Sequence, residues 1–148
     1  MNLKFETINF EIIENIAIIR LNRPNSYNSL NAKMAKELLE ISYECDTNKK
    51  IRAIILTGEG DKAFCAGGDL KSFHETGNVA KHLKMVTHDL HGAITKFSRM
   101  NSPLIVAVNG VAAGAGLSFV GFADLAIAKS SATFVSAYTK AGLTPDGS

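Results

Sequence analysis

Residues 51–70 decide the fold, and they read IRAIILTGEGDKAFCAGGDL. The stretch starts with a continuous apolar run, which is typical of a strand that is covered on both faces. A turn with two glycines breaks the run. Small residues then precede Asp69 and Leu70, and small residues let a ligand approach the backbone closely. The stretch therefore predicts a buried parallel strand over residues 51–57, followed by a strand, a tight turn and a helix start around residues 64–70.

The same design returns at residues 108–116, VNGVAAGAG, after a second apolar run. A helix N-terminus leaves several backbone N–H groups without partners and favours a negatively charged oxygen. Two such termini aimed at one point form an oxyanion hole from main chain alone. Taken singly, each segment is better explained as a tight turn against neighbouring backbone, and the presence of both weakens that explanation.

The rest of the chain predicts an α/β fold with a largely parallel sheet, because strands and helices alternate from residue 16 onward. Apolar and polar residues alternate over residues 8–12, and a second strand is expected at residues 16–21, so the chain opens with a hairpin. Ser29 or Asn31 is the expected N-cap of the first helix. Further helices and strands are expected over residues 30–45, 78–100, 104–108, 113–122 and 125–128.

Length and composition indicate one globular domain, since the chain has 148 residues, of which 46% are hydrophobic and 20% charged. The net charge of +2 is too close to neutral for a dedicated nucleic-acid binder. Cys45 and Cys65 make neither a disulfide framework nor a zinc site, and we expect free thiols in a reducing compartment.

Targeting and membrane signals are weak. The N-terminus has no long apolar core, so a secretory signal is not expected. Residues 104–128 are the most membrane-like stretch, but Asn109, Ser118 and Asp124 interrupt them, which favours a buried strand, turn and helix over a membrane span. The expected setting is the cytoplasm, or the mitochondrial matrix in a eukaryote, with neither membrane nor nucleic acid as a partner.

Two other kinds of site are disfavoured. Phe119 stands where a dinucleotide-binding G-x-G-x-x-G loop that starts at Gly114 needs its third glycine. His88 and His91 share a helix face, but Asp89 is a poor third ligand, so a solvated face is expected and no metal.

Residues 51–70 and 103–116, in this order and separation, resemble the enoyl-CoA hydratase/isomerase (crotonase) superfamily. Residues 22–30, NRPNSYNSL, resemble the family's first coenzyme A loop. The resemblance covers essentially the whole chain. It implies the crotonase-like α/β fold, a spiral of ββα units. Residues 1–148 would be the N-terminal part of that spiral core, with the C-terminal helical region absent. A homotrimer or hexamer is implied for the full-length protein.

The resemblance also implies where an acyl-CoA substrate lies. Its thioester carbonyl would sit between the N–H groups of Gly68 and Ala115, which would stabilise the enolate formed when a neighbouring proton leaves. Coenzyme A enters as the thioester part of the substrate, so no separate cofactor is implied. The residues implied to bind it are Asn25, Ser26, Tyr27, Ala66, Gly68, Asp69 and Leu70. Lys71 is a weaker candidate for the phosphates, with an ordinary solvated lysine as the alternative.

The chain departs from the family at two positions where its hydratases carry glutamates, since these read Ser118 and Tyr138 here. Neither side chain is an acid or a base near pH 7 in its ordinary state. Asp146 instead resembles the aspartate of isomerase branches such as the 1,2-epoxyphenylacetyl-CoA isomerases. A single carboxyl that takes a proton at one carbon and returns it at another suits isomerisation. The Pro-Asp-Gly sequence around Asp146 is also ordinary turn chemistry.

The favoured hypothesis is therefore an acyl-CoA isomerase acting on an unsaturated or epoxide thioester. An enoyl-CoA hydratase of fatty-acid β-oxidation and a catalytically impaired CoA-binding homologue remain as alternatives. Phe73 and Met85 are expected to line the acyl pocket.

Overall fold

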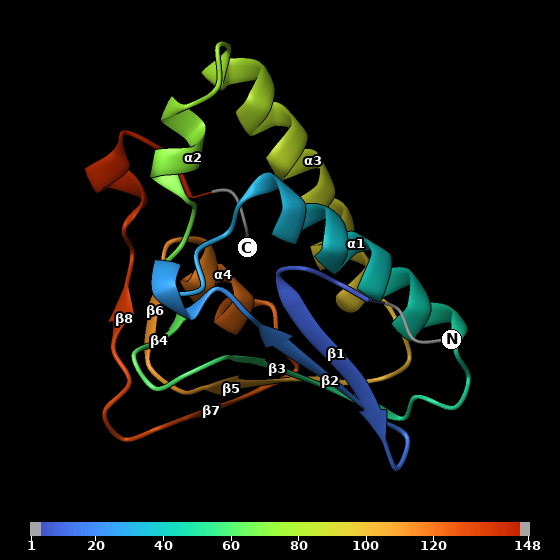
Figure 1. The fold of residues 1–148 in the computed structure, drawn as a ribbon. Coiled ribbons are helices and arrows are strands. Elements are labelled where there is room, and N and C mark those ends of the chain that lie inside the picture. Colours follow the sequence, from blue (N-terminus) through green and yellow to red (C-terminus); the bar gives the residue numbers. More distant parts are fainter. Residues whose placement is uncertain (1–3, 146–148) are drawn as a thin grey trace.

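The computed structural model describes residues 4–145 of the chain and arranges them as two sheets with helices packed against them (Figure 1). The strands are β1 (Ile8–Ile13), β2 (Ile16–Leu21), β3 (Ala53–Gly58), β4 (Ala63–Cys65), β5 (Leu104–Val108), β6 (Val111–Ala113), β7 (Leu125–Ala128) and β8 (Phe134–Val135). The helices are α1 (Ala32–Thr47), α2 (Leu70–His74), α3 (Val79–Phe97) and α4 (Ala115–Gly121), with short 3-10 helices η1 (Pro24–Ser26) and η2 (Tyr138–Ala141).

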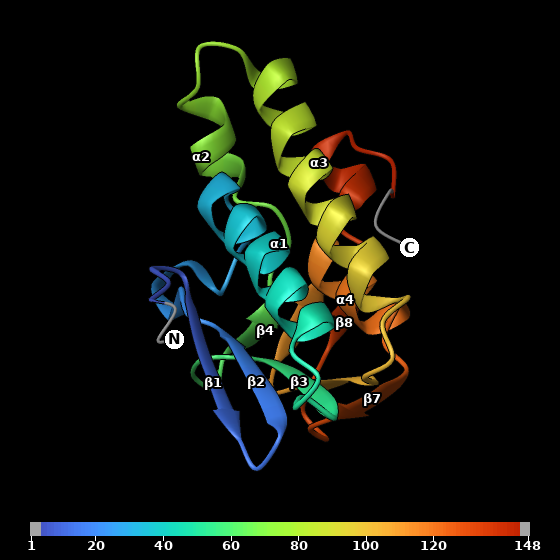
Figure 2. The ribbon, with the colours of Figure 1, turned by 90° about the vertical axis from the view of Figure 1, so that its right-hand side faces the viewer.

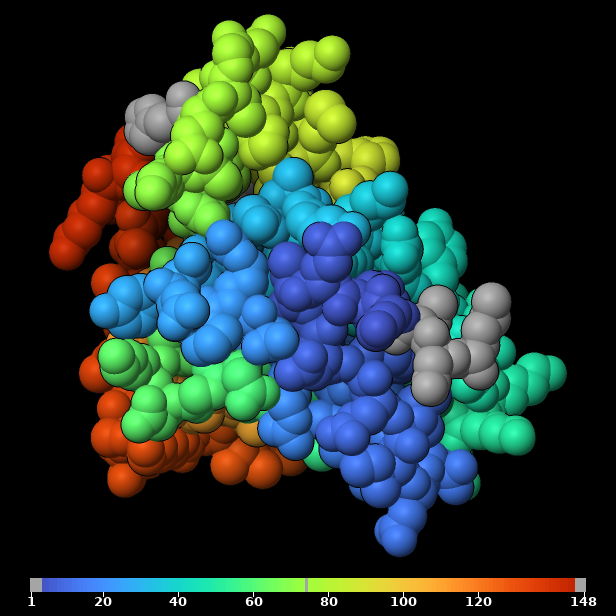
Figure 3. Space-filling view, viewed as in Figure 1, coloured from blue at the N-terminus to red at the C-terminus, as the bar shows by residue number. Residues whose placement is uncertain are grey.

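The larger sheet has five strands in the order β1-β2-β3-β5-β7. β1 and β2 pair antiparallel, which confirms the predicted hairpin, and this blue hairpin is prominent on the surface shown in Figure 3. All other neighbours in this sheet are parallel, with Ile54 opposite Leu104 and Val106 opposite Ala126. The smaller sheet, β4-β6-β8, is parallel throughout. The predicted α/β class with a largely parallel sheet is confirmed.

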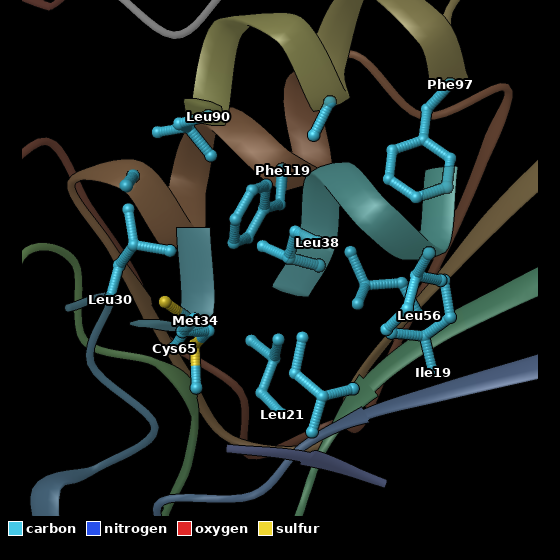
Figure 4. Close-up of a cluster of buried hydrophobic side chains, with 14 of the residues drawn as sticks. Ile19, Leu21, Leu30, Met34, Leu38, Leu56, Cys65, Leu90, Phe97 and Phe119 are labelled. Atoms are coloured by element: carbon cyan, nitrogen blue, oxygen red, sulfur yellow. The ribbon is translucent and has the colours of Figure 1, made fainter. Parts of the chain in front are cut away.

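Helices α1 and α3 pack side by side over one face of the larger sheet (Figure 2). The core lies between these layers, where Ile19 and Leu56 from the strands and Leu38 and Phe97 from the helices are almost fully buried (Figure 4). Burying a side chain of this kind stabilises a fold by about 1.5–3 kcal/mol. This packing holds the carboxyl ends of β3 and β5 in place, and the segments that carry the site follow those ends.

The prediction that the strand at residues 51–57 is covered on both faces is wrong for the described residues. Ile54 and Leu56 are buried on the face below the helices, whereas Ile55 on the other face is only half-buried. Further along the same sheet, Leu125 and Ile127 of β7 are 54% and 59% exposed. An apolar run alone therefore did not distinguish a strand buried on both faces from one with a partly open second face.

The helix predicted at residues 113–122 is shorter, because it runs from Ala115 to Gly121. The residues before it form β6, which pairs with β4 and β8. Of the two predicted N-caps of α1, Asn31 is confirmed, since its Oδ1 accepts a hydrogen bond from the Met34 N–H at 2.9 Å. No helix of the described chain is long and apolar enough to cross a bilayer.

Candidate active site

Two glycine turns, one between β4 and α2 and the other between β6 and α4, meet at the centre of the site. Gly67 has a φ of +97° and Gly114 a φ of +50°, a region that side chains with a Cβ rarely adopt. A Cβ added to Gly67 would lie 3.0 Å from the Ala113 carbonyl oxygen, and one added to Gly114 would lie 3.6 Å from the Gly67 Cα. Glycine at both positions therefore lets the two backbones come into direct contact.

The first turn of α4 also lies against backbone, in this case that of β4. A Cβ on Gly116 would lie within 2.9 Å of the carbonyl carbon of Cys65 and closer still to its oxygen. Cys65 is fully buried at this contact. Burial raises the pKa of its thiol to about 12, although a hydrogen bond from the Gly67 backbone acts in the opposite direction. The thiol therefore stays protonated at neutral pH, so it is unsuited to act as a nucleophile.

A cavity of about 190 Å³ opens beside the two turns, and both Gly68 and Ala115 line it. Ala115 is the first residue of α4, a position whose N–H has no acceptor within its own helix. The structure shows no acceptor for the N–H of Gly68 or of Ala115 among residues 4–145. The two predicted oxyanion donors are therefore brought to one cavity, and neither is engaged by a described group.

The remaining walls of this cavity are mostly apolar. Phe73 from α2 lines it as predicted. Met85 does not line it, because its side chain is 59% exposed and lies beside a separate surface hollow. The helix period explains the error, since the α3 residues that do line the cavity follow an i, i+3, i+4, i+7 stripe that excludes position 85. These residues are Leu83, Val86, Thr87 and Leu90.

The loop at residues 23–30 runs alongside the first glycine turn. The Leu30 N–H donates to the Gly67 carbonyl at 2.7 Å, and the Asp69 N–H donates to the Leu30 carbonyl at 2.8 Å. Asn28 is buried within the loop, where its Nδ2 donates to the carbonyls of Glu59 and Ala63, each at 2.9 Å. These bonds hold the predicted coenzyme A loop against the predicted oxyanion turn.

An ion pair strengthens this attachment. The Arg23 guanidinium lies 2.7 Å from an Asp69 carboxylate oxygen and also donates to the Ser29 carbonyl at 2.6 Å. Asp69 is in addition the N-cap of α2, because its Oδ1 accepts from the Ser72 N–H. Burial acts to raise the pKa of Asp69, but the hydrogen bonds from Arg23 and Ser72 outweigh it, so the pKa lies below its usual value. Asp69 is therefore ionised, and it connects the loop at residues 23–30 to the start of α2.

The residues predicted to bind coenzyme A fall into two groups. Ala66, Gly68 and Leu70 line the cavity, whereas Asn25, Ser26, Tyr27 and Asp69 do not. Asn25 and Tyr27 face a smaller hollow that they share with residues 59–63, where the light blue and green surfaces meet in Figure 3. Lys71 is exposed and lies outside both hollows. The contacts of all these residues with coenzyme A stay predictions.

Ser118 and Tyr138, which occupy the positions of the family's glutamates, are brought together. The Ser118 Oγ lies 2.8 Å from the Tyr138 hydroxyl oxygen, and Tyr138 also lines the cavity. Sequence reasoning singled out both positions but missed that the two side chains form a pair. Asp146 lies outside the described residues; Leu143 and Thr144, which shortly precede it, line the cavity.

The described part of the chain contains no group of three His, Cys, Asp or Glu residues that could hold a metal ion. His88 of the predicted histidine pair is exposed beside the outer hollow on α3.

The sequence profile described as enoyl-CoA hydratase/isomerase matches residues 11–148. The chain belongs to this family. A protein of Rhodobacter capsulatus named probable enoyl-CoA hydratase is 41% identical over 145 residues, which are 97% of this chain and 54% of that protein. The 1,2-epoxyphenylacetyl-CoA isomerase of Escherichia coli is 36% identical over 143 residues, which are 95% of this chain and 54% of that protein.

A solved structure supports the enoyl-CoA hydratase/isomerase fold directly. The crystal structure of an enoyl-CoA hydratase/isomerase from Mycobacterium paratuberculosis superposes with a TM-score of 0.89 at 29% identity and covers 98% of this chain and 58% of that one. The predicted crotonase-like α/β fold is therefore confirmed. The chain spans about half the length of these family relatives.

Proposed function

We propose that this chain is the acyl-CoA-binding part of an enzyme that stabilises a thioester enolate between the N–H groups of Gly68 and Ala115. The observation that carries the proposal is the shared cavity, where two N–H groups without a described acceptor stand beside an apolar wall. An acyl chain matches such a wall, because burying it removes apolar surface from water.

The chemistry follows from where charge develops. When a proton leaves the carbon next to the thioester carbonyl, the electron pair moves to the carbonyl oxygen. Donors fixed around that oxygen therefore stabilise the transition state more than the ground state. Removing one donor of this kind from an oxyanion hole costs about 2.7–4 kcal/mol.

Asp146 is our candidate for the group that moves the proton. Its carboxylate would take a proton from the carbon next to the carbonyl, and the resulting carboxylic acid would return that proton to another carbon. In an unsaturated thioester the double bond shifts. In an epoxide thioester the electron pair of the enolate instead breaks one ring C–O bond and the ring oxygen takes the proton, so neither case consumes a co-reactant. In support, Leu143 and Thr144 bring the chain to the cavity wall shortly before Asp146. We therefore favour isomerisation of an unsaturated or epoxide acyl-CoA.

An enoyl-CoA hydratase is the second candidate, and the name of the Rhodobacter relative favours it. Hydration needs groups that activate water and protonate the substrate, whereas the described positions 118 and 138 supply hydroxyl groups. A homologue that binds coenzyme A thioesters without turning them over is the third. For the whole protein we propose a homotrimer or hexamer in the cytoplasm, with coenzyme A entering only as part of the substrate.

The test is to incubate the purified protein in D₂O with unsaturated and epoxide acyl-CoA thioesters and to follow deuterium at the α carbon by NMR. We expect exchange and a shifted double bond. Asp146→Asn should slow both by about 10²–10⁴-fold, the range of general acid–base catalysis. Asp89→Asn, on the outer side of α3, is the matched control and should leave both rates unchanged.

Each other outcome selects an alternative. Fast addition of water without double-bond migration would replace the isomerase by the hydratase. Binding of thioesters with neither exchange nor hydration would leave the non-catalytic homologue. An unchanged rate in Asp146→Asn would remove that carboxyl from the mechanism.

A further inference from the structure

The peptide unit between Gly67 and Gly68 decides where one proposed oxyanion donor points. A peptide unit is planar and trans, so its carbonyl and its N–H point in opposite directions. The Gly67 carbonyl accepts a hydrogen bond from the Leu30 N–H at 2.7 Å. The loop at residues 23–30 therefore directs the N–H of Gly68 through the carbonyl that shares its peptide unit.

The peptide unit between Ser29 and Leu30 extends this connection to a charged side chain. Its N–H is the donor to Gly67, and its carbonyl accepts from the Arg23 guanidinium at 2.6 Å. A chain of hydrogen bonds thus runs from Arg23 through two peptide units to the N–H of Gly68, and every bond in it is donated in the same sense. Aligned bonds of this kind polarise and strengthen one another.

Burial shields this chain from water. Ser29, Leu30 and Gly67 are buried, and the Arg23 side chain is only 19% exposed. The side chain of Leu30 packs in the hydrophobic core, which fixes the position of its backbone (Figure 4). Electrostatic effects are stronger in such surroundings than in water. The positive charge of Arg23 therefore acts on the two peptide units with little screening.

Asp69 holds the Arg23 guanidinium in place. Its carboxylate lies 2.7 Å from one guanidinium nitrogen, while the other terminal nitrogen donates to Ser29. The rigid fork of an arginine allows both contacts at once. The Asp69 N–H also donates to the Leu30 carbonyl at 2.8 Å. The loop is therefore fastened to the turn on both sides of Gly68.

The second proposed donor, the N–H of Ala115, is held differently. The carbonyl that shares its peptide unit belongs to Gly114 and accepts from the N–H groups of Leu117 and Ser118 at 2.9 and 3.1 Å. Ala115 is therefore directed by its own helix, whereas Gly68 depends on a separate segment of the chain. A change at Arg23 should affect one donor and leave the other in place.

We propose that Arg23 is a positioning residue of the oxyanion hole, which orients and polarises the Gly68 N–H through the two peptide units between them. Asp69 in turn positions Arg23. The Arg23 side chain does not line the cavity, so it acts on the thioester carbonyl only through this main-chain donor. The inference rests on the proposed function, because it concerns how one of the proposed donors works.

Two other roles for Arg23 make different predictions. An ion pair that only stabilises the fold leaves the carbonyl of a bound thioester unchanged in the folded protein. A direct contact with coenzyme A weakens binding but also leaves that carbonyl unchanged once the thioester is bound. A hydrogen bond to the carbonyl oxygen lowers the C=O stretching frequency, so this frequency separates the proposed role from both alternatives.

The experiment records difference infrared spectra of butanoyl-CoA, labelled with carbon-13 at the carbonyl, bound to the purified protein. Calorimetry gives the dissociation constant, and thermal unfolding shows that each variant is folded. We expect the wild type to lower the C=O frequency relative to the thioester in water. Arg23→Gln should reverse part of this lowering.

The same variant should slow α-proton exchange by about 10-fold, which is less than the 10²–10³-fold or so that loss of a whole donor costs. Its dissociation constant should change far less than its rate, because an oxyanion donor acts mainly on the transition state. Asp69→Asn should shift the frequency in the same direction by a smaller amount. Arg20→Gln, in the ion pair with Glu11 on the β1–β2 hairpin, is the matched control and should change none of these quantities.

The inference is overturned if folded Arg23→Gln keeps the wild-type C=O frequency, whatever happens to its stability or its dissociation constant. An equal change of frequency in Arg20→Gln overturns it as well. In both cases the wild type still binds the thioester and lowers its frequency, so the proposed function stands. A wild type that binds no thioester, or binds it without lowering the frequency, refutes the proposed function and the inference with it. Asp69→Asn provides the decision if Arg23→Gln does not fold.

Discussion

Replacing Ala115 with proline would remove one proposed oxyanion donor with little change to the fold. Ala115 is the first residue of α4 and Gly114 is its N-cap. Proline is favoured at this helical position, because its fixed φ suits the helix and the N–H it lacks is unpaired there in any case. Among residues 4–145 the Ala115 N–H has no acceptor, so the substitution breaks no described hydrogen bond.

The expected effects on stability and on rate are therefore very different. With no bond lost, we expect the free energy of unfolding to change by less than about 0.5 kcal/mol, as for ordinary substitutions away from special features. Losing one donor of an oxyanion hole costs about 2.7–4 kcal/mol of transition-state stabilisation, or about 10²–10³ in kcat. The ring carbon that replaces the hydrogen adds a steric cost for the carbonyl in the same direction.

The assay follows α-proton exchange of an acyl-CoA in D₂O by NMR, together with thermal unfolding of the same samples. The control is Ala32→Pro, the corresponding first position of α1 after its N-cap Asn31. It removes an equivalent N–H from a residue that does not line the cavity, and it should retain full activity. A proline variant at Ala115 that keeps its melting temperature and also exchanges protons at the wild-type rate would refute the assignment of this N–H.

Two further predictions concern the fold around the site. Gly116→Ala should destabilise the protein by about 1–3 kcal/mol or more in chemical denaturation, because the added methyl group would overlap the Cys65 backbone, which cannot move aside. The control is Gly77→Ala, which should not destabilise the protein, because nothing lies within 4 Å of its added methyl group. Asp69→Asn keeps a capping oxygen but loses the charge opposite Arg23, so unfolding at pH 7 should require about 1–3 kcal/mol less. The pKa of Asp69 is lowered in the folded state. The extra unfolding free energy of the wild type over Asp69→Asn is therefore complete above the unfolded pKa of about 4, and it is lost as the pH falls through the lower folded pKa. Urea unfolding at pH 7 and at about pH 2 checks this, and a gap that persists at low pH would contradict the ion-pair explanation.

Local patterns predicted the larger sheet well, and non-local pairing accounts for what they missed. Residues 8–12 alternate and residues 104–108 form an apolar run, and both are strands. Residues 111–113 are too few for a period, and they become β6 only through pairing with β4 and β8. The helix therefore starts later than the sequence suggested.

In the candidate site, too, local patterns predicted some features and missed those that depend on contacts between distant parts of the chain. The glycines at positions 67 and 114 are readable as turns from sequence, and the resemblance to a family located both proposed donors. Met85 is apolar, but its angle on α3 turns it away from the cavity, whereas Leu83 and Leu90 lie on the stripe that faces the cavity. The hydrogen bond between Ser118 and Tyr138 joins residues twenty positions apart, and no local pattern predicts it.

The contact between Gly67 and Gly114 has a consequence for how such a protein diversifies. Both proposed donors belong to the main chain, so most single-residue replacements leave them in place, while the interlocked glycines keep the two turns together. Mutation can then change the side chains that line the cavity beside these donors, at positions such as 73 and 138. New acyl specificities can therefore evolve while the two main-chain N–H groups that stabilise the enolate are retained.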